Sequence, residues 1–332
     1  MGILLSEKTK VLIQGITGKE GQKAVKAMSD YHTQVVCGVT PKKGGQEVEG
    51  RPVFNSVKEA LSVILSPPRR AFGETGGTKD PLNQTERDSS ATPAGAQNDK
   101  LANVVSAVYV PPFAAKAAIL EAVEAGIPLI NIIVERIPIK DTAYCLAAAK
   151  EKNIRIIGPS SLGFIVPGVG RIGVVGGPLV NEIFQPGSIG VISRSGGMTN
   201  ELSWQIRKGG LGQSAAVHVG GDLLMGTTYA DLLLLFEKDE QTKAVVIFGE
   251  HGGSYEFEIV EAIKKKEFTK PLAIYIGGKF ANVFPEGMNV GHAGAIVARG
   301  QGAAEKEAAL ASVGVKIAER YEDLVELVKP YV

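Results

Sequence analysis

Phosphoryl transfer is the first chemistry that the residue types suggest, and it centres on one histidine. His292 lies in the run VGHAGAI (290–296), where small residues leave the imidazole uncovered and glycines free the backbone. A neutral imidazole is nucleophilic near physiological pH, so an exposed histidine that faces a phosphate can be phosphorylated and can release the group again. The other three histidines, His32, His218 and His251, have plainer surroundings. The competing interpretation of His292 is a loop histidine that bonds only the backbone.

A histidine with this task needs a partner that orients its second ring nitrogen. The run FGEHGG (248–253) offers Glu250 at the end of an apolar strand. A carboxylate there would fix the tautomer of the ring and stabilise the charge that develops on phosphorylation. His292 and Glu250 are therefore the expected catalytic pair.

Three glycine-containing turns are expected to receive anions. The runs QGITGKEG (14–21) and VISRSGGMTN (191–200) each lead from a strand into a helix, where free N–H groups and the helix dipole attract phosphate. The N–H groups of Ser195, Gly196 and Gly197 would point at one spot, with the Ser195 hydroxyl as a further donor and helix cap. A third turn, GGD (220–222), follows a strand, where ligands of open α/β sheets collect.

The first turn differs from a dinucleotide-binding turn. Its spacing is G-x-x-G-x-x-G rather than G-x-G-x-x-G, and no acidic residue ends the next strand, QVVCG (34–38). A nicotinamide oxidoreductase is therefore disfavoured. The run TPKKGG (40–45) follows instead, and its lysines would suit a phosphorylated ribose. Glycines also serve tight packing of a helix on a sheet, so a purely structural role of this turn stays open.

These residues need sheets that bring strand ends together. Short β-branched runs alternate with amphipathic stretches, which predicts an α/β protein with two doubly wound parallel sheets. The expected strands are 11–14, 34–38, 104–110, 129–134 and 154–157, then 189–192, 215–219, 244–248 and 272–276. The expected helices are 19–28, 57–65, 114–125 and 142–152, then 200–208, 228–237, 255–265, 303–311 and a last one from residue 321.

Two segments interrupt that pattern. Prolines 159, 167, 178 and 186 should break any regular element in residues 158–187, so the junction between the domains is expected there. Residues 66–100 carry prolines, glycines and polar residues with almost no aliphatic ones, and cannot bury enough apolar surface to offset the entropy of ordering. We expect a flexible surface insertion at 66–100.

Composition narrows the class of protein. The chain has 332 residues, 44% of them hydrophobic, and a formal net charge of +1, so no global charge favours a nucleic acid or an anionic membrane as partner. Cys37 and Cys145 lie in apolar segments without a C-x-x-C spacing, which predicts buried thiols in a reducing compartment and no metal site. Because no stretch approaches the roughly 18 apolar residues of a membrane span, we expect a cytoplasmic protein, or one in an organelle matrix if a presequence has been removed.

Several motifs together resemble one family. The runs QGITGKEG, TPKKGG, YVPPF (109–113), SRSG (193–196), GGD, GEHGG (249–253) and GHAGA (291–295) occur in the order found in the α subunit of succinyl-CoA synthetase and its relatives, which include the citryl-CoA synthetase small subunit and part of ATP-citrate lyase. The resemblance implies a Rossmann-like CoA-binding domain (1–165, with the insertion 66–100) and a flavodoxin-like ligase domain (166–332). It covers nearly the whole chain apart from 66–100.

The resemblance also implies roles for residues. In it, His292 is the phosphohistidine, Glu250 is its partner, and Ser195, Gly196 and Gly197 hold the phosphate. The residues implied to contact CoA are Thr17, Gly18, Lys19, Glu20, Lys43, Ile133, Val134 and Glu135. The implied reaction is nucleotide-dependent ligation of a carboxylic acid to CoA through an acyl phosphate and a phosphohistidine. ATP or GTP and Mg²⁺ would bind a separate β subunit with an ATP-grasp domain, in an αβ or α₂β₂ assembly.

For the acid, the motifs favour citrate over succinate, and another carboxylic acid is the remaining alternative. Gly197 and Asn200 resemble the citrate-handling branch, whereas succinate-type enzymes usually carry Thr and Tyr at these places. A tricarboxylate needs room and amide donors, which Gly and Asn would supply. Arg136 stands where relatives often have Gly, so a backbone turn at the CoA site is expected to differ. The alternative of another class is a CoA-binding regulatory protein without catalysis, which would have no need of both His292 and Glu250.

Overall fold

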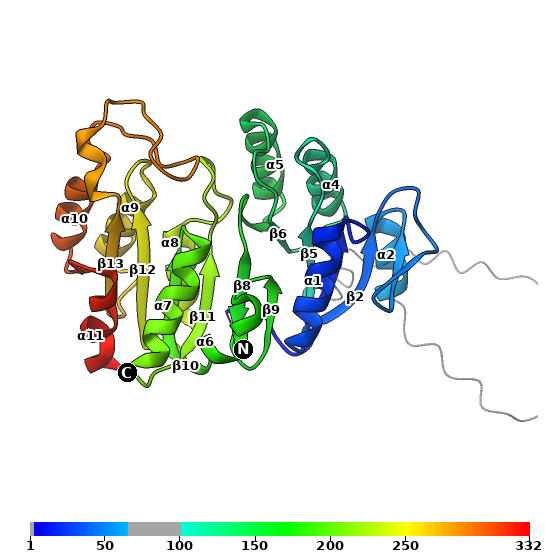
Figure 1. Cartoon of the computed structure of the whole chain (residues 1–332), viewed down its shortest axis with the longest axis horizontal. Helices are drawn as coiled ribbons and strands as arrows, with labels where there is room; N and C mark the ends of the chain where they lie inside the picture. The colour runs from blue at the N-terminus through cyan, green and yellow to red at the C-terminus, as the bar shows by residue number, and fades with distance from the viewer. Residues whose placement is uncertain (1–2, 66–100) are drawn as a thin grey trace, which may run out of the picture.

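The computed structural model describes residues 3–65 and 101–332, and the predicted insertion at 66–100 lies outside these described residues. Within them the chain forms two seven-stranded sheets that stand next to each other, with helices on both faces (Figure 1). The helices α1 (Lys19–Asp30) and α7 (Gly196–Lys208) lie on the near side of their sheets in that view. The predicted α/β class, with a Rossmann-like domain followed by a ligase domain, is confirmed.

The first sheet has the strand order β3-β4-β2-β1-β5-β6-β7. Its strands are β1 (Lys10–Gln14), β2 (Gln34–Val39), β3 (Glu47–Val48), β4 (Arg51–Phe54), β5 (Val104–Val108), β6 (Leu129–Ile132) and β7 (Arg155–Ile157). Its other helices are α2 (Val57–Ile64), α4 (Pro112–Glu124) and α5 (Ile139–Glu151). All pairs are parallel except β3 with β4, so the carboxyl ends of β1, β2, β5 and β6 share one edge.

The second sheet has the order β14-β13-β12-β10-β11-β8-β9. Its strands are β8 (Gly163–Val166), β9 (Gly170–Gly173), β10 (Pro186–Ser193), β11 (Gln213–His218), β12 (Ala244–Glu250), β13 (Leu272–Gly277) and β14 (Lys316–Ile317). Its other helices are α6 (Val180–Ile183), α8 (Tyr229–Lys238), α9 (Tyr255–Lys264), α10 (Ala303–Ala311) and α11 (Leu324–Val328). Short 3₁₀ turns η1 (Gly177–Leu179), η2 (Lys279–Val283), η3 (Tyr321–Asp323) and η4 (Lys329–Tyr331) complete it.

The expectation of purely parallel sheets is wrong in both domains, at the β3–β4 pair of the first sheet and at the junction in the second. Strand β8 pairs antiparallel with both β11 and β9, so the second sheet is mixed, and 158–187 contains strands that were not predicted. The prolines spare these strands because Pro159 and Pro167 fall outside them and Pro186 only begins β10. By sheet membership we place the domain division just before Gly163, slightly earlier than the predicted division after residue 165.

A buried arginine fastens the two domains. Arg171 in β9 donates from Nε to the carbonyl of Ala27 at 2.9 Å and from Nη1 to the carbonyl of Val175 at 2.9 Å. Thr33 completes the contact, because its hydroxyl donates to the Arg171 carbonyl at 2.7 Å and accepts the Arg171 N–H at 2.9 Å. Satisfied in this way, the guanidinium can be buried at the domain boundary.

The prediction that Cys37 and Cys145 are buried free thiols is confirmed. Cys37 and Cys145 are free and buried, and burial raises the pKa of their thiols to about 12 and about 11. Among residues 3–65 and 101–332, no helix combines the length and apolarity that crossing a membrane requires. The cytoplasmic location stays a prediction.

Candidate active site

His292 and Glu250 meet although 42 positions separate them in the sequence. Glu250 ends β12, and His292 Nδ1 lies 2.6 Å from its Oε1. The carboxylate side chain is 10% exposed and the imidazole 40% exposed, so one partner is fixed while the other meets solvent. The hydrogen bond to Glu250, against the opposing effect of burial, raises the pKa of His292.

This contact engages Nδ1 of the imidazole. An ionised carboxylate can only accept, so Nδ1 carries the proton that His292 donates to Glu250. The neutral ring then keeps its lone pair on Nε2, which is the nucleophilic nitrogen. The loop is closed by Ala295 N–H, which donates to the His292 carbonyl at 2.8 Å, and by Asn289 Nδ2, which donates to the same oxygen at 2.7 Å. The interpretation of His292 as a loop histidine that bonds only the backbone is therefore wrong.

The GGD turn supplies the surface on which the ring lies. A Cβ on Gly221 would stand 2.9 Å from His292 Cδ2, so only glycine leaves room for the imidazole there. Gly220 has φ +112°, and a side chain on it would collide with the carbonyl of Pro159. The N–H of Gly294 also donates to the Gly221 carbonyl at 3.3 Å, which ties the His292 loop to the turn that follows β11.

The start of α7 differs in one donor from the predicted cradle. Ser195 caps the helix, because its Oγ accepts the N–H of Met198 at 3.4 Å. Its own N–H is already engaged by Ser193 Oγ at 3.0 Å, so it is not a free donor. Within the described part of the chain, the N–H groups of Gly196 and Gly197 have no hydrogen-bond partner, which leaves two of the three expected amides for an anion.

Arg194 joins this helix start to the histidine loop, a role that the sequence did not reveal. Its guanidinium is fully buried and donates from Nη2 to the carbonyl of Asp222 at 2.8 Å. It also lies 5.8 Å from the ring centroid of Tyr255, and a Cβ on Gly294 would collide with it. Its charge acts to lower the pKa of His292. An arginine at the end of the apolar run that precedes Ser195 was the available signal.

Asn200, predicted to line the acid pocket, has a structural bond. Its Oδ1 accepts the N–H of Gly176 at 2.9 Å, which holds the loop before η1 against α7. Gly176 has φ +82°, so this bond fixes a left-handed turn. Only the amide NH₂ of Asn200 is left to meet a substrate.

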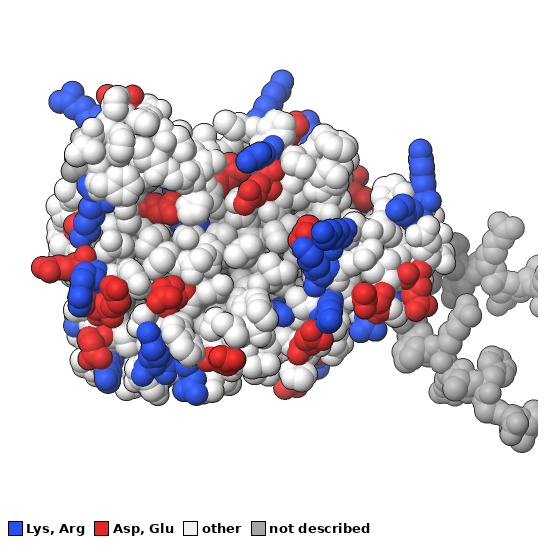
Figure 2. Space-filling view, in the orientation of Figure 1, with Lys and Arg blue, Asp and Glu red and all other residues white. Residues whose placement is uncertain are grey.

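The predicted CoA residues of the first domain fall into two loops at one sheet edge. The hydroxyl of Thr17 lies 3.3 Å from that of Thr40, which brings the turn after β1 beside the lysine loop after β2. Gly18 caps α1 without a side-chain bond, and Lys19, Glu20 and Lys43 are exposed around it. The uncapped helix start and the lysines fit the diphosphate and phosphorylated ribose of CoA. Figure 2 shows basic side chains grouped over α1, on a face where acidic and basic side chains are otherwise interspersed.

The predicted CoA residues after β6 reach the histidine site. Ser160 Oγ donates to Glu135 Oε1 at 3.3 Å, and the Glu135 charge acts to raise the pKa of His292. Val134 is buried, and Ile133 is partly buried. Arg136 has φ +59°, the left-handed region that favours glycine, so a non-glycine residue here carries backbone strain. The first domain therefore contributes a charged residue to the surroundings of His292.

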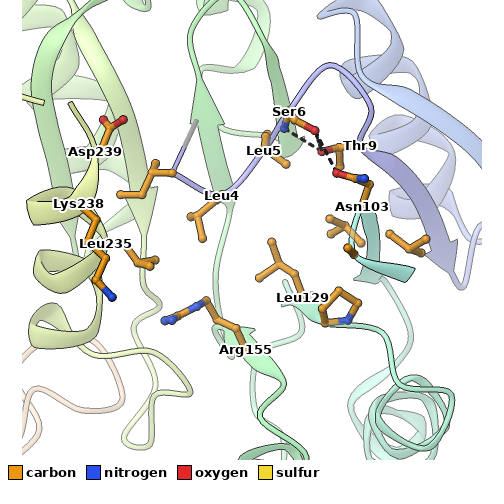
Figure 3. A pocket seen from close by; sticks show the side chains of 15 residues that line it. Leu4, Leu5, Ser6, Thr9, Asn103, Leu129, Arg155, Leu235, Lys238 and Asp239 are labelled. Carbon is orange, nitrogen blue, oxygen red and sulfur yellow. Dashed lines mark hydrogen bonds between the residues drawn. The ribbon is translucent and has the colours of Figure 1, made fainter. Parts of the chain in front are cut away.

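A cavity of about 390 Å³ between the domains lies elsewhere. Figure 3 shows Arg155 pointing into it, among apolar side chains that include Leu4, Leu129 and Leu235. Val104, Leu129 and Arg155 begin β5, β6 and β7, so this cavity opens at the amino ends of the strands. His292 lies instead beside Gly221 and Glu250, so the cavity is separate from the candidate site.

Comparison with known proteins decides the family. The CoA-binding domain matches residues 6–71, and the CoA-ligase domain matches residues 192–329. The α subunit of the ADP-forming succinate–CoA ligase of Aquifex aeolicus is 42% identical over 99% of this chain and 94% of its own. The chain belongs to the α-subunit family of the ADP-forming acid–CoA ligases. A subunit of the ADP-forming sulfoacetate–CoA ligase of Bilophila wadsworthia, in the same family, is 38% identical over 99% of both chains.

The same ligase fold occurs in a solved structure. The ATP citrate lyase of Methanothrix soehngenii, in complex with citrate and coenzyme A, matches 99% of this chain with a TM-score of 0.81 and 23% identity. This chain spans half the length of that one, and the likeness concerns the fold. The family predicted from the motifs is confirmed, and with it the assignment as an acid–thiol ligase that uses CoA.

Proposed function

We propose that this chain is the subunit of an ADP-forming acid–CoA ligase that carries the phosphoryl group on His292. The observation that carries this proposal is the 2.6 Å contact between His292 Nδ1 and Glu250 Oε1, which leaves Nε2 bare on a half-exposed ring. Beside it, the N–H groups of Gly196 and Gly197, which have no partner among the described residues, and the buried charge of Arg194 favour a group with negative charge.

Atom balance orders the steps. His292 Nε2 takes the γ-phosphoryl group of the nucleotide, and the nucleoside diphosphate leaves. The carboxylate oxygen of the acid then attacks phosphorus, the P–N bond breaks, and an acyl phosphate forms with the ring neutral again. The thiolate sulfur of CoA attacks the acyl carbon, and phosphate leaves as the thioester forms. The phosphohistidine forms before the acyl phosphate. If phosphate moved from the acyl phosphate to His292 instead, the acid would lose the phosphate that must leave when CoA attacks the acyl carbon.

The nucleotide and Mg²⁺ are proposed to bind a β-type partner of the ATP-grasp class. Several relatives bear the names of subunits, which supports a two-subunit enzyme. An imidazole that is 40% exposed at the surface of this chain suits delivery to a second active centre. Light scattering of the assembled enzyme would distinguish an αβ from an α₂β₂ stoichiometry.

For the acid we propose a small carboxylate with a second anionic group, with succinate first and citrate as the second candidate. Relatives near 40% identity over the full chain bear the name succinate–CoA ligase, which supports the first. Gly197 and Asn200 support citrate, although the bond of Asn200 to Gly176 takes up its oxygen. Initial rates of ADP release with each acid, in native enzyme and in Gly197→Thr/Asn200→Tyr, separate them. A variant that changes neither acid's kcat/KM would remove these residues from the pocket.

The test of the proposal is label discharge. The assembled enzyme is incubated with γ-labelled ATP, freed of nucleotide, and then offered acid and CoA separately and together. We expect the label to stay on the subunit with CoA alone and to leave it when the acid is added, and we expect fast release of inorganic phosphate only when acid and CoA are both present. Label that never appears, or that leaves at the same rate without the acid, would contradict the proposed cycle.

A further inference from the structure

A buried ion pair lies directly behind Glu250. Lys306 of α10 and Glu256 of α9 are both 0% exposed, and their Nζ and Oε2 atoms are 2.6 Å apart. Lys306 Nζ also donates to the carbonyl of Glu250 at 2.6 Å and to that of Gly252 at 2.7 Å. Glu256 Oε1 accepts the N–H of Glu250 at 3.1 Å. The pair therefore holds both polar backbone groups of the residue that orients His292.

The carboxylate of Glu250 depends on this support. Its Oε1 contacts His292, while its Oε2 is buried and has no hydrogen-bond partner among the residues that the structure describes. No second side chain thus fixes the carboxylate, and its place follows from the backbone of Glu250. At a 2.6 Å contact, a small shift of that backbone would lengthen the bond to the ring.

Stability alone is a weak reason for such a pair. Burying two charges has a high desolvation cost, and apolar residues of similar volume are often as stable or more stable. All three N–H donors of the Lys306 ammonium are used. One bonds Glu256, one bonds the carbonyl of Glu250 at the end of β12, and one bonds the carbonyl of Gly252 in the loop that follows. That geometry is what a positioning device needs, since outer residues that hold a catalytic histidine's partner set its tautomer and orientation.

We propose that Lys306 and Glu256 are positioning residues for the phosphoryl carrier, holding Glu250 so that His292 keeps its proton on Nδ1. The catalytic consequence rests on the proposed function, whereas the tautomer can be read without any activity. Two variants probe it: Lys306→Met/Glu256→Met removes the pair with little change in volume, and Glu256→Gln keeps the shape but not the charge. The matched control is Lys279→Met/Glu307→Gln, which removes an ion pair of 3.0 Å that reaches the same helix without touching Glu250.

The first readout is the ¹⁵N chemical shifts of the histidine rings in the full chain, with His292→Asn to assign the signal. We expect Nδ1–H and bare Nε2 in the native chain and in the control, and in the double Met variant a shift toward the tautomer mixture of free histidine. The second is the rate of His292 phosphorylation in the assembled enzyme, expected to fall about 10- to 100-fold, as for outer partners of metal-bound histidines. The KM for CoA should stay unchanged.

A folded double variant that keeps the native ring shifts and rate would overturn the inference. If that variant does not fold, Glu256→Gln decides: a partial tautomer shift with a slower rate supports positioning, and native values for both refute it. Failure of the native chain to accept phosphate would refute the proposed function alone, because the ring shifts would still show whether the pair sets the tautomer.

Discussion

Replacing Glu250 by Gln tests the electrostatic part of the site with the least change of shape. A charge-assisted hydrogen bond is about twice as strong as a neutral one, so the 2.6 Å contact to His292 should weaken by about 1.4 kcal/mol. If the whole loss raises the free energy of the transition state of phosphorylation, in which charge develops on the ring, the maximal rate falls about tenfold. The direction of the pH dependence provides an independent check.

Because the bond to Glu250 raises the pKa of His292, its loss lowers that pKa. The neutral, nucleophilic ring forms as pH rises through the pKa, so the midpoint of the rate–pH curve should move to lower pH in Glu250→Gln while the plateau drops. Rapid-quench measurement of labelled phosphate on His292, across pH values around 6.5, gives both quantities. Glu261→Gln, in an exposed ion pair on α9, is the control. A midpoint that moves upward, or a plateau equal to the native one, would refute the assigned role of Glu250.

Three further changes have defined outcomes. Gly221→Ala places a Cβ 2.9 Å from the imidazole, so phosphorylation should slow at least tenfold in a chain whose melting temperature changes little; native rates would show that the ring has room to move. Lys43→Ala should raise the KM for CoA several-fold and leave phosphorylation of His292 by ATP unchanged, and an unchanged KM would remove the loop 40–45 from the CoA site. Burial lowers the pKa of His218 to about 4, so the unfolded state gains protons first as pH falls below about 6.5. Folding stability should then decline by up to about 3 kcal/mol toward pH 4, and His218→Gln should flatten that slope in denaturant titrations.

The parts of the site that lie in short motifs could be predicted from the sequence. His292 and Glu250 could be chosen because each side chain stands in a glycine-rich run beside apolar strand residues, and because parallel strands bring their carboxyl ends together. The GGD turn was predicted to follow a strand. That the imidazole packs against this turn follows only from the distance between Gly221 and the ring.

What the sequence could not supply are contacts between distant charges. Lys306 lies 50 positions from Glu256, and each belongs to a helix whose polar residues ordinarily face solvent. Arg194 is similar, since its burial depends on how the loops at 222 and 294 close over it. The strands β8 and β9 were missed because the prolines around them were interpreted as excluding strands. A proline can equally lie just outside a strand, as Pro159 and Pro167 do here.

His292 is the proposed carrier of the phosphoryl group. Mass spectrometry of the assembled enzyme, digested under alkaline conditions after incubation with ATP, locates the added phosphate on a peptide. We predict one phosphorylated site, at His292, that acid removes and that is missing from His292→Asn. Phosphate on another residue, or equal labelling of His292→Asn, would contradict the account.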